Sequence, residues 1–148
     1  MRLFNLVWCI EMARIMALDY GKKRTGVAVT DPLKIVAASA QTIATSELMN
    51  YLTDYFAKNE VERVVVGMPR KMDGTPSENY QNIEKFLATF AKKFPQMPVV
   101  MHDERFTSVL AQRAMIEGGV KKMQRREKGL ADTISASIIL QSYLDSNL

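Results

Sequence analysis

Three acidic residues stand where the surrounding chain is apolar. Asp19 follows the apolar run 15–18, Glu104 follows the run 99–101 closely, and Asp132 lies early in an apolar stretch near the C-terminus. Carboxylates gathered in one place repel one another, and burial penalises their charged forms further unless cations intervene. Mg²⁺ prefers oxygen ligands and completes its shell with water and substrate phosphate. Together the three acids would suit phosphoryl transfer, in which two ions clamp the attacking and leaving oxygens.

Each acid taken alone is equally typical of a turn or a helix end, because strand ends commonly carry aspartate. Their joint occurrence favours a site. Asp103 stands beside Glu104, and successive strand side chains point to opposite faces, so only one of the two can face inward. His102 is the single histidine of the chain. A lone histidine in a strand is more often a packed residue than a catalytic base.

Basic residues flank the acids along the chain. One group follows Asp19, a second precedes a predicted helix N-terminus, which is a place suited to an anion, and a third precedes Asp132. The candidate nucleic-acid-binding residues are Lys22, Lys23, Arg24, Arg70, Lys71, Arg105, Lys121, Lys122, Arg125, Arg126 and Lys128. Such runs are also typical of solvated loops, but their position beside the acids favours phosphate contact.

The apolar pattern predicts the elements that position these residues. Strands are expected at 15–18, 26–29, 34–43, 61–67 and 99–101, and helices at 46–58, from 77, at 107–117 and from 130. Ser46 is the expected N-cap of the first helix. The short link 20–23 predicts an antiparallel hairpin, and the later strands, separated by helices, predict parallel crossovers. The order β-β-β-α-β-α-β-α-α gives an α/β fold: a mixed sheet of about five strands, with helices on both faces and the acids at the ends of adjacent strands.

Length and composition limit the class of protein. The 148 residues fit one domain, expected at 12–148 after an N-terminal extension at 1–11 that is flexible or loosely docked. A single cysteine excludes an internal disulfide and a cysteine-rich zinc site, and favours the cytoplasm. No apolar run reaches the ~18 residues of a membrane span. The net charge of +4 permits a nucleic-acid partner.

Several motifs resemble the YqgF/RuvX family in order and spacing. They are ALDYGKKRTGVAVTD at 17–31, VVGMP at 65–69 with DGT at 73–75, DERFT at 103–107, and Asp132 followed by IILQSYL at 138–144. The resemblance covers about residues 13–145. It implies a ribonuclease H-like fold and a nuclease that uses Mg²⁺ or Mn²⁺, with Asp19, Glu104 and Asp132 as catalytic and metal-binding residues.

The resemblance implies one of two substrates, since the family is described as a Holliday-junction resolvase and as the nuclease that matures the 5′ end of pre-16S ribosomal RNA. One departure concerns the metal ligands. The related RuvC resolvases place a second acid three residues after the helix aspartate, where this chain has Ser135. One possible ligand is therefore missing.

The leading hypothesis is a metal-dependent nuclease acting on a ribosomal RNA precursor or on branched DNA. The alternative is a non-catalytic nucleic-acid-binding module of the same fold. The segment Asp19-Tyr20-Gly21 also resembles the phosphate loop of actin-like and sugar-kinase ATPases. Those folds need two such domains, and this chain has the length of one. Both a monomer and a homodimer stay open, because a symmetric four-way junction suits a two-fold dimer and RNA trimming does not require one.

Overall fold

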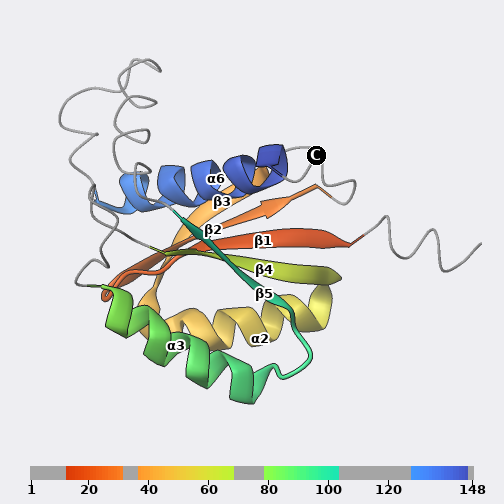
Figure 1. Cartoon of the computed structure of the whole chain (residues 1–148), viewed down its shortest axis with the longest axis vertical. Helices are drawn as coiled ribbons and strands as arrows, with labels where there is room; N and C mark the ends of the chain where they lie inside the picture. The colour runs from red at the N-terminus through yellow and green to blue at the C-terminus, as the bar shows by residue number, and fades with distance from the viewer. Residues whose placement is uncertain (1–12, 32–36, 69–78, 104–127, 147–148) are drawn as a thin grey trace, which may run out of the picture.

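The structure is a computed structural model that describes residues 13–31, 37–68, 79–103 and 128–146 (Figure 1). The strands are β1 (Arg14–Asp19), β2 (Arg24–Thr30), β3 (Ala37–Ala44), β4 (Val61–Met68) and β5 (Val99–Asp103). The helices are the short 3₁₀ helix η1 (Thr45–Glu47), α2 (Leu48–Lys58), α3 (Tyr80–Lys93) and α6 (Lys128–Ser146). The predicted order of elements is confirmed for this part of the chain, and the helix expected at 107–117 lies outside it.

The five strands form one mixed sheet in the order β3-β2-β1-β4-β5. β1 pairs antiparallel with β2, and β2 with β3, which confirms the hairpin. β4 pairs parallel with β1 and with β5, as the crossover helices require. One prediction is wrong: β4 lies between β1 and β5, so the strands that precede the two acids are not adjacent.

Helices α2 and α3 cover one face of the sheet, and α6 covers the other (Figure 1). The α2/α3 face buries large side chains, among them Met16, Leu18, Phe86 and Phe90. The α6 face buries Ile15, Ala17, Ala28 and Val65 against the helix. Alternate residues of β1 therefore point to opposite faces, as strand geometry demands.

The central strands are continuous apolar runs because both of their faces are covered. In β4, Val64 and Val66 face α2 and α3, whereas Val65 faces α6. Each is at most 1% exposed. A continuous apolar run of this kind is typical of a strand whose two faces are both covered.

The start of the first helix differs from the prediction. Ser46 lies inside η1, and neither η1 nor α2 has a side-chain N-cap hydrogen bond, so the prediction of Ser46 as a cap is wrong. The neighbouring Thr45 instead turns its hydroxyl toward the loop after β1. Ser77, the expected start of the second helix, lies outside the described residues.

Within the described ranges, no helix is long and apolar enough to cross a membrane.

Candidate active site

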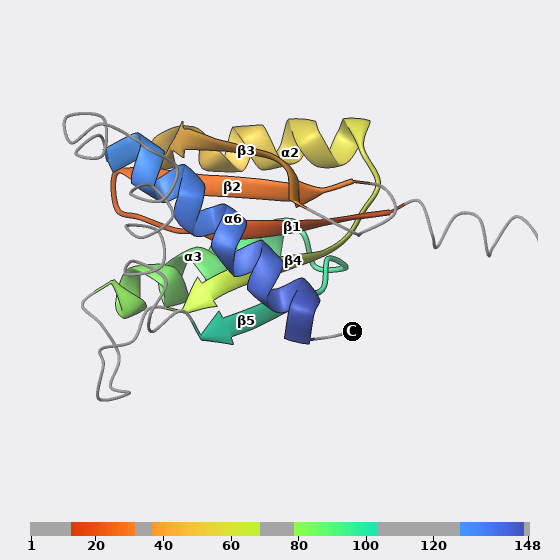
Figure 2. The same cartoon turned by 90° about the horizontal axis from the view of Figure 1, so that it is seen from above.

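The candidate site lies at the edge of the sheet where β1, β4 and β5 end. These strands run parallel, so their carboxyl ends share one edge, and the first turns of α6 lie over the same edge (Figure 2). Asp19 is the last residue of β1. Because Ile15 and Ala17 face α6, the alternation of the strand puts Asp19 on that face too.

A row of paired residues connects Asp19 to α6. Asp19 pairs with Gly26 of β2, and Gly26 pairs with Thr42 of β3. The Thr42 hydroxyl is hydrogen-bonded to the Thr133 hydroxyl of α6. Asp132 directly precedes Thr133, so its backbone lies at the end of α6 that is anchored to this row. The structure thus brings the Asp19 and Asp132 positions to one end of one face.

Glycines leave the sheet bare on both sides of Asp19. Gly26 is its partner in β2. On the other side, Val66 of β4 pairs with Leu18, so Gly67 is the residue level with Asp19. Gly67 shares the α6 face with Val65, two residues earlier. The two strand positions level with Asp19 therefore carry no side chain of their own.

The third acid follows β5. Val100 packs on the α6 face, and His102 also reaches α6, where its Nε2 lies 3.0 Å from the Ser142 Oγ. The His102 ring also meets the Tyr143 ring edge to face, at 6.3 Å between centroids. These contacts place the half-buried His102 side chain against α6. Glu104 lies outside the described residues, and Asp103 closes β5, where it pairs with Met68.

The loop that follows Asp19 is held by two residues that the sequence did not single out. The Thr45 hydroxyl donates to the Gly21 carbonyl at 2.6 Å, and the Thr45 amide donates to the Lys23 carbonyl at 3.0 Å. Asn79, just before α3, donates its side-chain amide to the Tyr20 carbonyl at 2.6 Å. The loop is therefore tied to both β3 and α3.

Gly21 is required in this loop for a steric reason. A Cβ at this position would lie 2.3 Å from the Arg24 carbonyl oxygen, which no real side chain tolerates. The tight loop brings Lys22 and Lys23 to the surface, where both are exposed, whereas Arg24 is half-buried.

The remaining predicted cations are not placed by the structure. Lys128 opens α6, but its side chain is outside the described part. The others that fall outside the described residues are Arg70, Lys71, Arg105, Lys121, Lys122, Arg125 and Arg126. Within the described residues, no three histidine, cysteine, aspartate or glutamate side chains form a group that could hold a metal ion.

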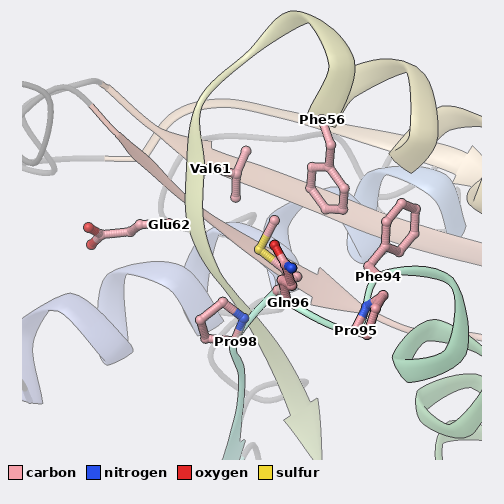
Figure 3. A pocket seen from close by; sticks show the side chains of 8 residues that line it. Phe56, Val61, Glu62, Phe94, Pro95, Gln96 and Pro98 are labelled. Atoms are coloured by element: carbon pink, nitrogen blue, oxygen red, sulfur yellow. The ribbon is translucent and has the colours of Figure 1, made fainter.

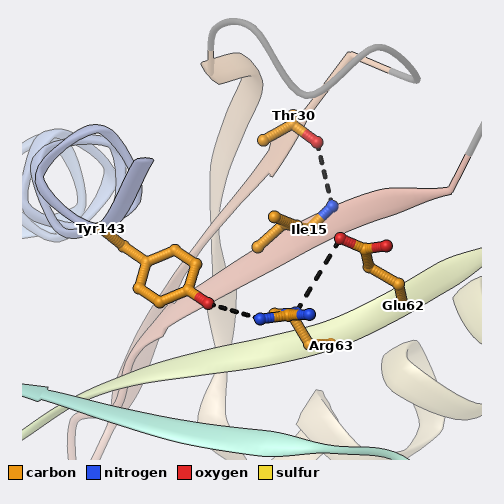
Figure 4. A network of polar contacts seen from close by, with 5 residues as sticks. All are labelled: Ile15, Thr30, Glu62, Arg63 and Tyr143. Atoms are coloured by element: carbon orange, nitrogen blue, oxygen red, sulfur yellow. Dashed lines mark hydrogen bonds and ion pairs between the residues drawn. The ribbon is translucent and has the colours of Figure 1, made fainter. Parts of the chain in front are cut away.

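The far end of α6 is fixed separately (Figure 4). The Arg63 guanidinium of β4 donates to the Tyr143 hydroxyl at 2.8 Å, and this hydrogen bond raises the pKa of Arg63. Glu62 lies 3.9 Å from the Arg63 Nε, which is an ion-pair distance without a hydrogen bond. Nearby, the Ile15 amide donates to the buried Thr30 hydroxyl at 2.9 Å. Polar contacts at both ends thus set the line along which α6 crosses the sheet.

One cavity of the described residues lies away from this edge (Figure 3). It measures about 390 Å³ and is lined by Phe56, Val61, Glu62, Phe94, Pro95, Gln96, Met97 and Pro98. Val61 and Glu62 open β4, so this cavity lies at the opposite end of the strands from Asp19. The one charged residue among its described lining residues is Glu62, and a carboxylate does not attract phosphate.

Comparison with known proteins matches the chain to one family along most of its length. The model of the RuvX family, described as Holliday junction resolvase, matches residues 13–146. A protein of Christiangramia forsetii named "Putative pre-16S rRNA nuclease" is 58% identical over 133 residues, which are 90% of this chain and 98% of the relative. A Bacteroides thetaiotaomicron protein of the same name is 53% identical over 135 residues, 91% of this chain and 98% of the relative.

The fold has a counterpart among solved structures. Thermus thermophilus RuvC in complex with a Holliday junction substrate superimposes with a TM-score of 0.54, covering 91% of this chain and 96% of that one. The sequence identity is 15%, so this similarity concerns the fold alone. It confirms the predicted ribonuclease H-like α/β architecture.

Proposed function

Because this chain belongs to the RuvX Holliday junction resolvase family, we propose that it is a nuclease that hydrolyses phosphodiester bonds in structured nucleic acid. The first proposed substrate is the 5′ end of pre-16S ribosomal RNA, and the second is branched DNA. The observation that carries the proposal is the identity of more than half the residues with a relative named as a pre-16S rRNA nuclease, over nearly the whole of both chains. The single cysteine supports a cytoplasmic place of action.

Asp19, Glu104 and Asp132 are the proposed catalytic residues. Asp19 and Asp132 are supported by their positions, because Asp19 ends β1 and Asp132 lies in the first turns of α6, at the same end of the sheet. For the third, Val100 and His102 mark the α6 face of β5, so the alternation of the strand does not favour Asp103, which directly follows His102. Glu104 is therefore preferred to Asp103.

The described part of the site fits a hard divalent cation. Asp19 supplies carboxylate oxygens, and the positions level with it in β2 and β4 are the glycines Gly26 and Gly67, which add no side chain. Mg²⁺ needs only one or two carboxylates, since it retains waters and takes substrate phosphate as a ligand. We assign Mg²⁺ or Mn²⁺ to Asp19, Glu104 and Asp132. Two such ions would stabilise the charge on the phosphate and favour deprotonation of the attacking water.

The protein's own contribution is to hold these groups in place. Asp19 ends a strand that is hydrogen-bonded on both sides, and the loop after it is tied down by Thr45 and Asn79. A carboxylate on so fixed a backbone needs little rearrangement when substrate arrives. Lys22 and Lys23, exposed on the same loop, would attract the phosphates that flank the cleaved bond.

The test offers the purified protein two labelled substrates, a four-way DNA junction and a pre-16S RNA fragment, with Mg²⁺ or Mn²⁺, and maps the products. Asp19→Asn, Glu104→Gln and Asp132→Asn should each reduce cleavage at least about 1,000-fold without unfolding the protein, since removal of one ligand disables the shared centre. Asp54→Asn is the matched control, because Asp54 is an exposed acid on α2 that pairs only with Lys58.

The results separate the alternatives. Near-normal rates in two of the three variants would show that the site is wrongly assigned. An inactive Asp103→Asn beside an active Glu104→Gln would exchange the two neighbours. Binding of both substrates without any product would favour the non-catalytic binding module.

A further inference from the structure

A smaller cavity lies beside the loop that follows Asp19. It measures about 260 Å³ and is lined by Tyr20, Thr45, Leu48, Met49, Lys85, Phe86 and Thr89. These residues come from the loop after β1, from the η1–α2 segment and from α3. The cavity therefore opens between α2 and α3, on the face opposite α6.

The position of this cavity connects it to the candidate active site. Tyr20 is the next residue after Asp19, so consecutive Cα atoms only ~3.8 Å apart lead from the site to the cavity wall. Asp19 points to the α6 face, and Tyr20 packs on the other. A nucleic-acid strand that crosses the sheet at Asp19 would pass the cavity within one or two nucleotides.

The walls of the cavity suit a flat, apolar group. The Tyr20 ring stacks on Phe86 with centroids 4.7 Å apart and an interplanar angle of 27°. Leu48 and Met49 add aliphatic surface on the α2 side. Phe86 is 7% exposed and fixes the orientation of Tyr20 from behind. The Tyr20 carbonyl is also held by Asn79, so this aromatic wall is preformed rather than mobile.

The rim of the cavity is positively charged. Among the described residues that line it, Lys85 alone is charged and is exposed, and Lys22 and Lys23 are exposed on the neighbouring loop. The larger cavity at the other end of the sheet has Glu62 in the corresponding role. Of these two cavities, only the one beside Asp19 combines aromatic walls with cations that would attract a phosphate.

We propose that this cavity receives one unpaired nucleobase of the substrate strand, next to the bond that is cleaved, while Lys85 contacts the adjoining phosphate. The proposal rests on the nuclease function proposed above and adds a subsite to it. The polar lining residues besides Lys85 are Tyr20, Thr45 and Thr89. These do not form the fixed donor and acceptor pattern that distinguishes bases, so the subsite accepts any base.

The experiment scans the substrate for a base contact. A fluorescein-labelled RNA hairpin with a single-stranded 5′ extension carries one abasic nucleotide at each position in turn. Its affinity is measured by anisotropy in the Asp132→Asn background, which prevents cleavage during the titration. One position within two nucleotides of the cleaved bond should lose affinity by roughly 5- to 150-fold, the range for loss of one base stacked on an aromatic side chain.

Two variants assign that position to the cavity. Thr89→Trp places a ring at the rim and should abolish the abasic penalty, because the base is already excluded. Lys85→Gln should reduce the slope of log affinity against log salt by about one unit. Lys92→Gln, on the last turn of the same helix, and Met97→Glu, in the other cavity, are the controls and should leave both quantities unchanged.

Each result decides the proposal. Equal affinity for all abasic substrates would overturn it, and so would a penalty that persists in Thr89→Trp, since the base would then be bound elsewhere. In both cases wild-type cleavage would still support the nuclease. Absence of both binding and cleavage would instead overturn the proposed function together with the subsite.

Discussion

The two faces of the sheet differ in the size of the side chains that they bury. Against α2 and α3 the sheet packs long and aromatic residues, such as Met16, Leu18 and Phe90. Against α6 it presents the alanines Ala17 and Ala28, each 0% exposed. The first face gains stability from its large buried apolar area. The second brings the backbone of a helix close to the strands.

This difference separates stability from the positioning of the site. Ala136 of α6 is also fully buried, so small residues meet across that interface. Close approach lets Thr133 reach Thr42 of β3, and it fixes the helix turn that carries Asp132. Away from the cavity beside Tyr20, core substitutions on the α2/α3 face should therefore change stability, whereas substitutions on the α6 face should change activity more than stability.

Phe90→Ala should have the largest effect on folding. Phe90 is 1% exposed, and its ring contacts Phe56, Phe86 and Phe94 at centroid distances of 5.0–6.3 Å. Loss of a fully buried phenylalanine costs about 3–5 kcal/mol. Urea denaturation measures it, with the exposed Thr89→Ala as control. Cleavage by the fraction that stays folded should be normal, and a specific loss of activity would contradict the separation of the two faces.

Ala17→Leu should have the opposite character. The added atoms have no space between β1 and α6, and overpacking costs about 1–3 kcal/mol. Because α6 must move away to accept them, Asp132 shifts relative to Asp19, two residues from the substitution. Cleavage should fall at least tenfold at a temperature where the variant and Phe90→Ala are both fully folded. Equal rates in the two variants would show that the α6 face does not position the site.

Thr45→Val should have a smaller effect, at the loop between the two faces. The substitution removes the hydroxyl that donates to the Gly21 carbonyl and is hydrogen-bonded to Thr25 at 2.9 Å, but it keeps the shape of the side chain. Loss of a half-buried hydrogen bond costs about 1 kcal/mol. The turnover rate should fall several-fold, and Thr45→Ser should restore it because the hydroxyl returns. If serine failed to restore the rate, the Thr45 methyl group rather than its hydrogen bonds would hold the loop.

Local patterns explain which parts of the fold were predictable. The hairpin of β1 and β2 follows from a short polar link between two apolar runs, and the double burial of β4 follows from Val64–Val65–Val66. Asp19 was identifiable as a candidate because it directly follows such a run and occurs together with Glu104 and Asp132, which also stand beside apolar stretches. These features depend on residues that are neighbours in the sequence, so the spacing of apolar residues predicts them directly.

Contacts between distant residues were not predictable. Thr133 and Thr42 are 91 residues apart, and Asn79 and Tyr20 are 59 apart. Nothing in a single threonine or asparagine indicates which carbonyl or hydroxyl it will meet, because strand order and helix crossing decide that. The same reason explains the error over β4, since periodicity does not show which parallel strand lies in the middle.

Two pairs of lysines differ only in their place on the fold. Lys22 and Lys23 are exposed beside Asp19, whereas Lys92 and Lys93 are exposed in the last turn of α3, on the α2/α3 side of the sheet. Both pairs are adjacent in sequence, so Gln substitution removes the same charge from each. Neither change should alter the free energy of unfolding by more than about 0.5 kcal/mol, as is usual for surface positions.

Only the first pair should affect nucleic-acid binding. If Lys22 and Lys23 each contact one phosphate, Lys22→Gln with Lys23→Gln should reduce the slope of log affinity against log salt by about two units. The loss should be similar for RNAs of different sequence, because phosphates carry no base identity. Lys92→Gln with Lys93→Gln should leave the slope unchanged, which separates local phosphate contact from a general effect of net charge. Equal changes in the two double variants would mean that the loop after Asp19 binds no phosphate, and that the exposed charge there serves solubility alone.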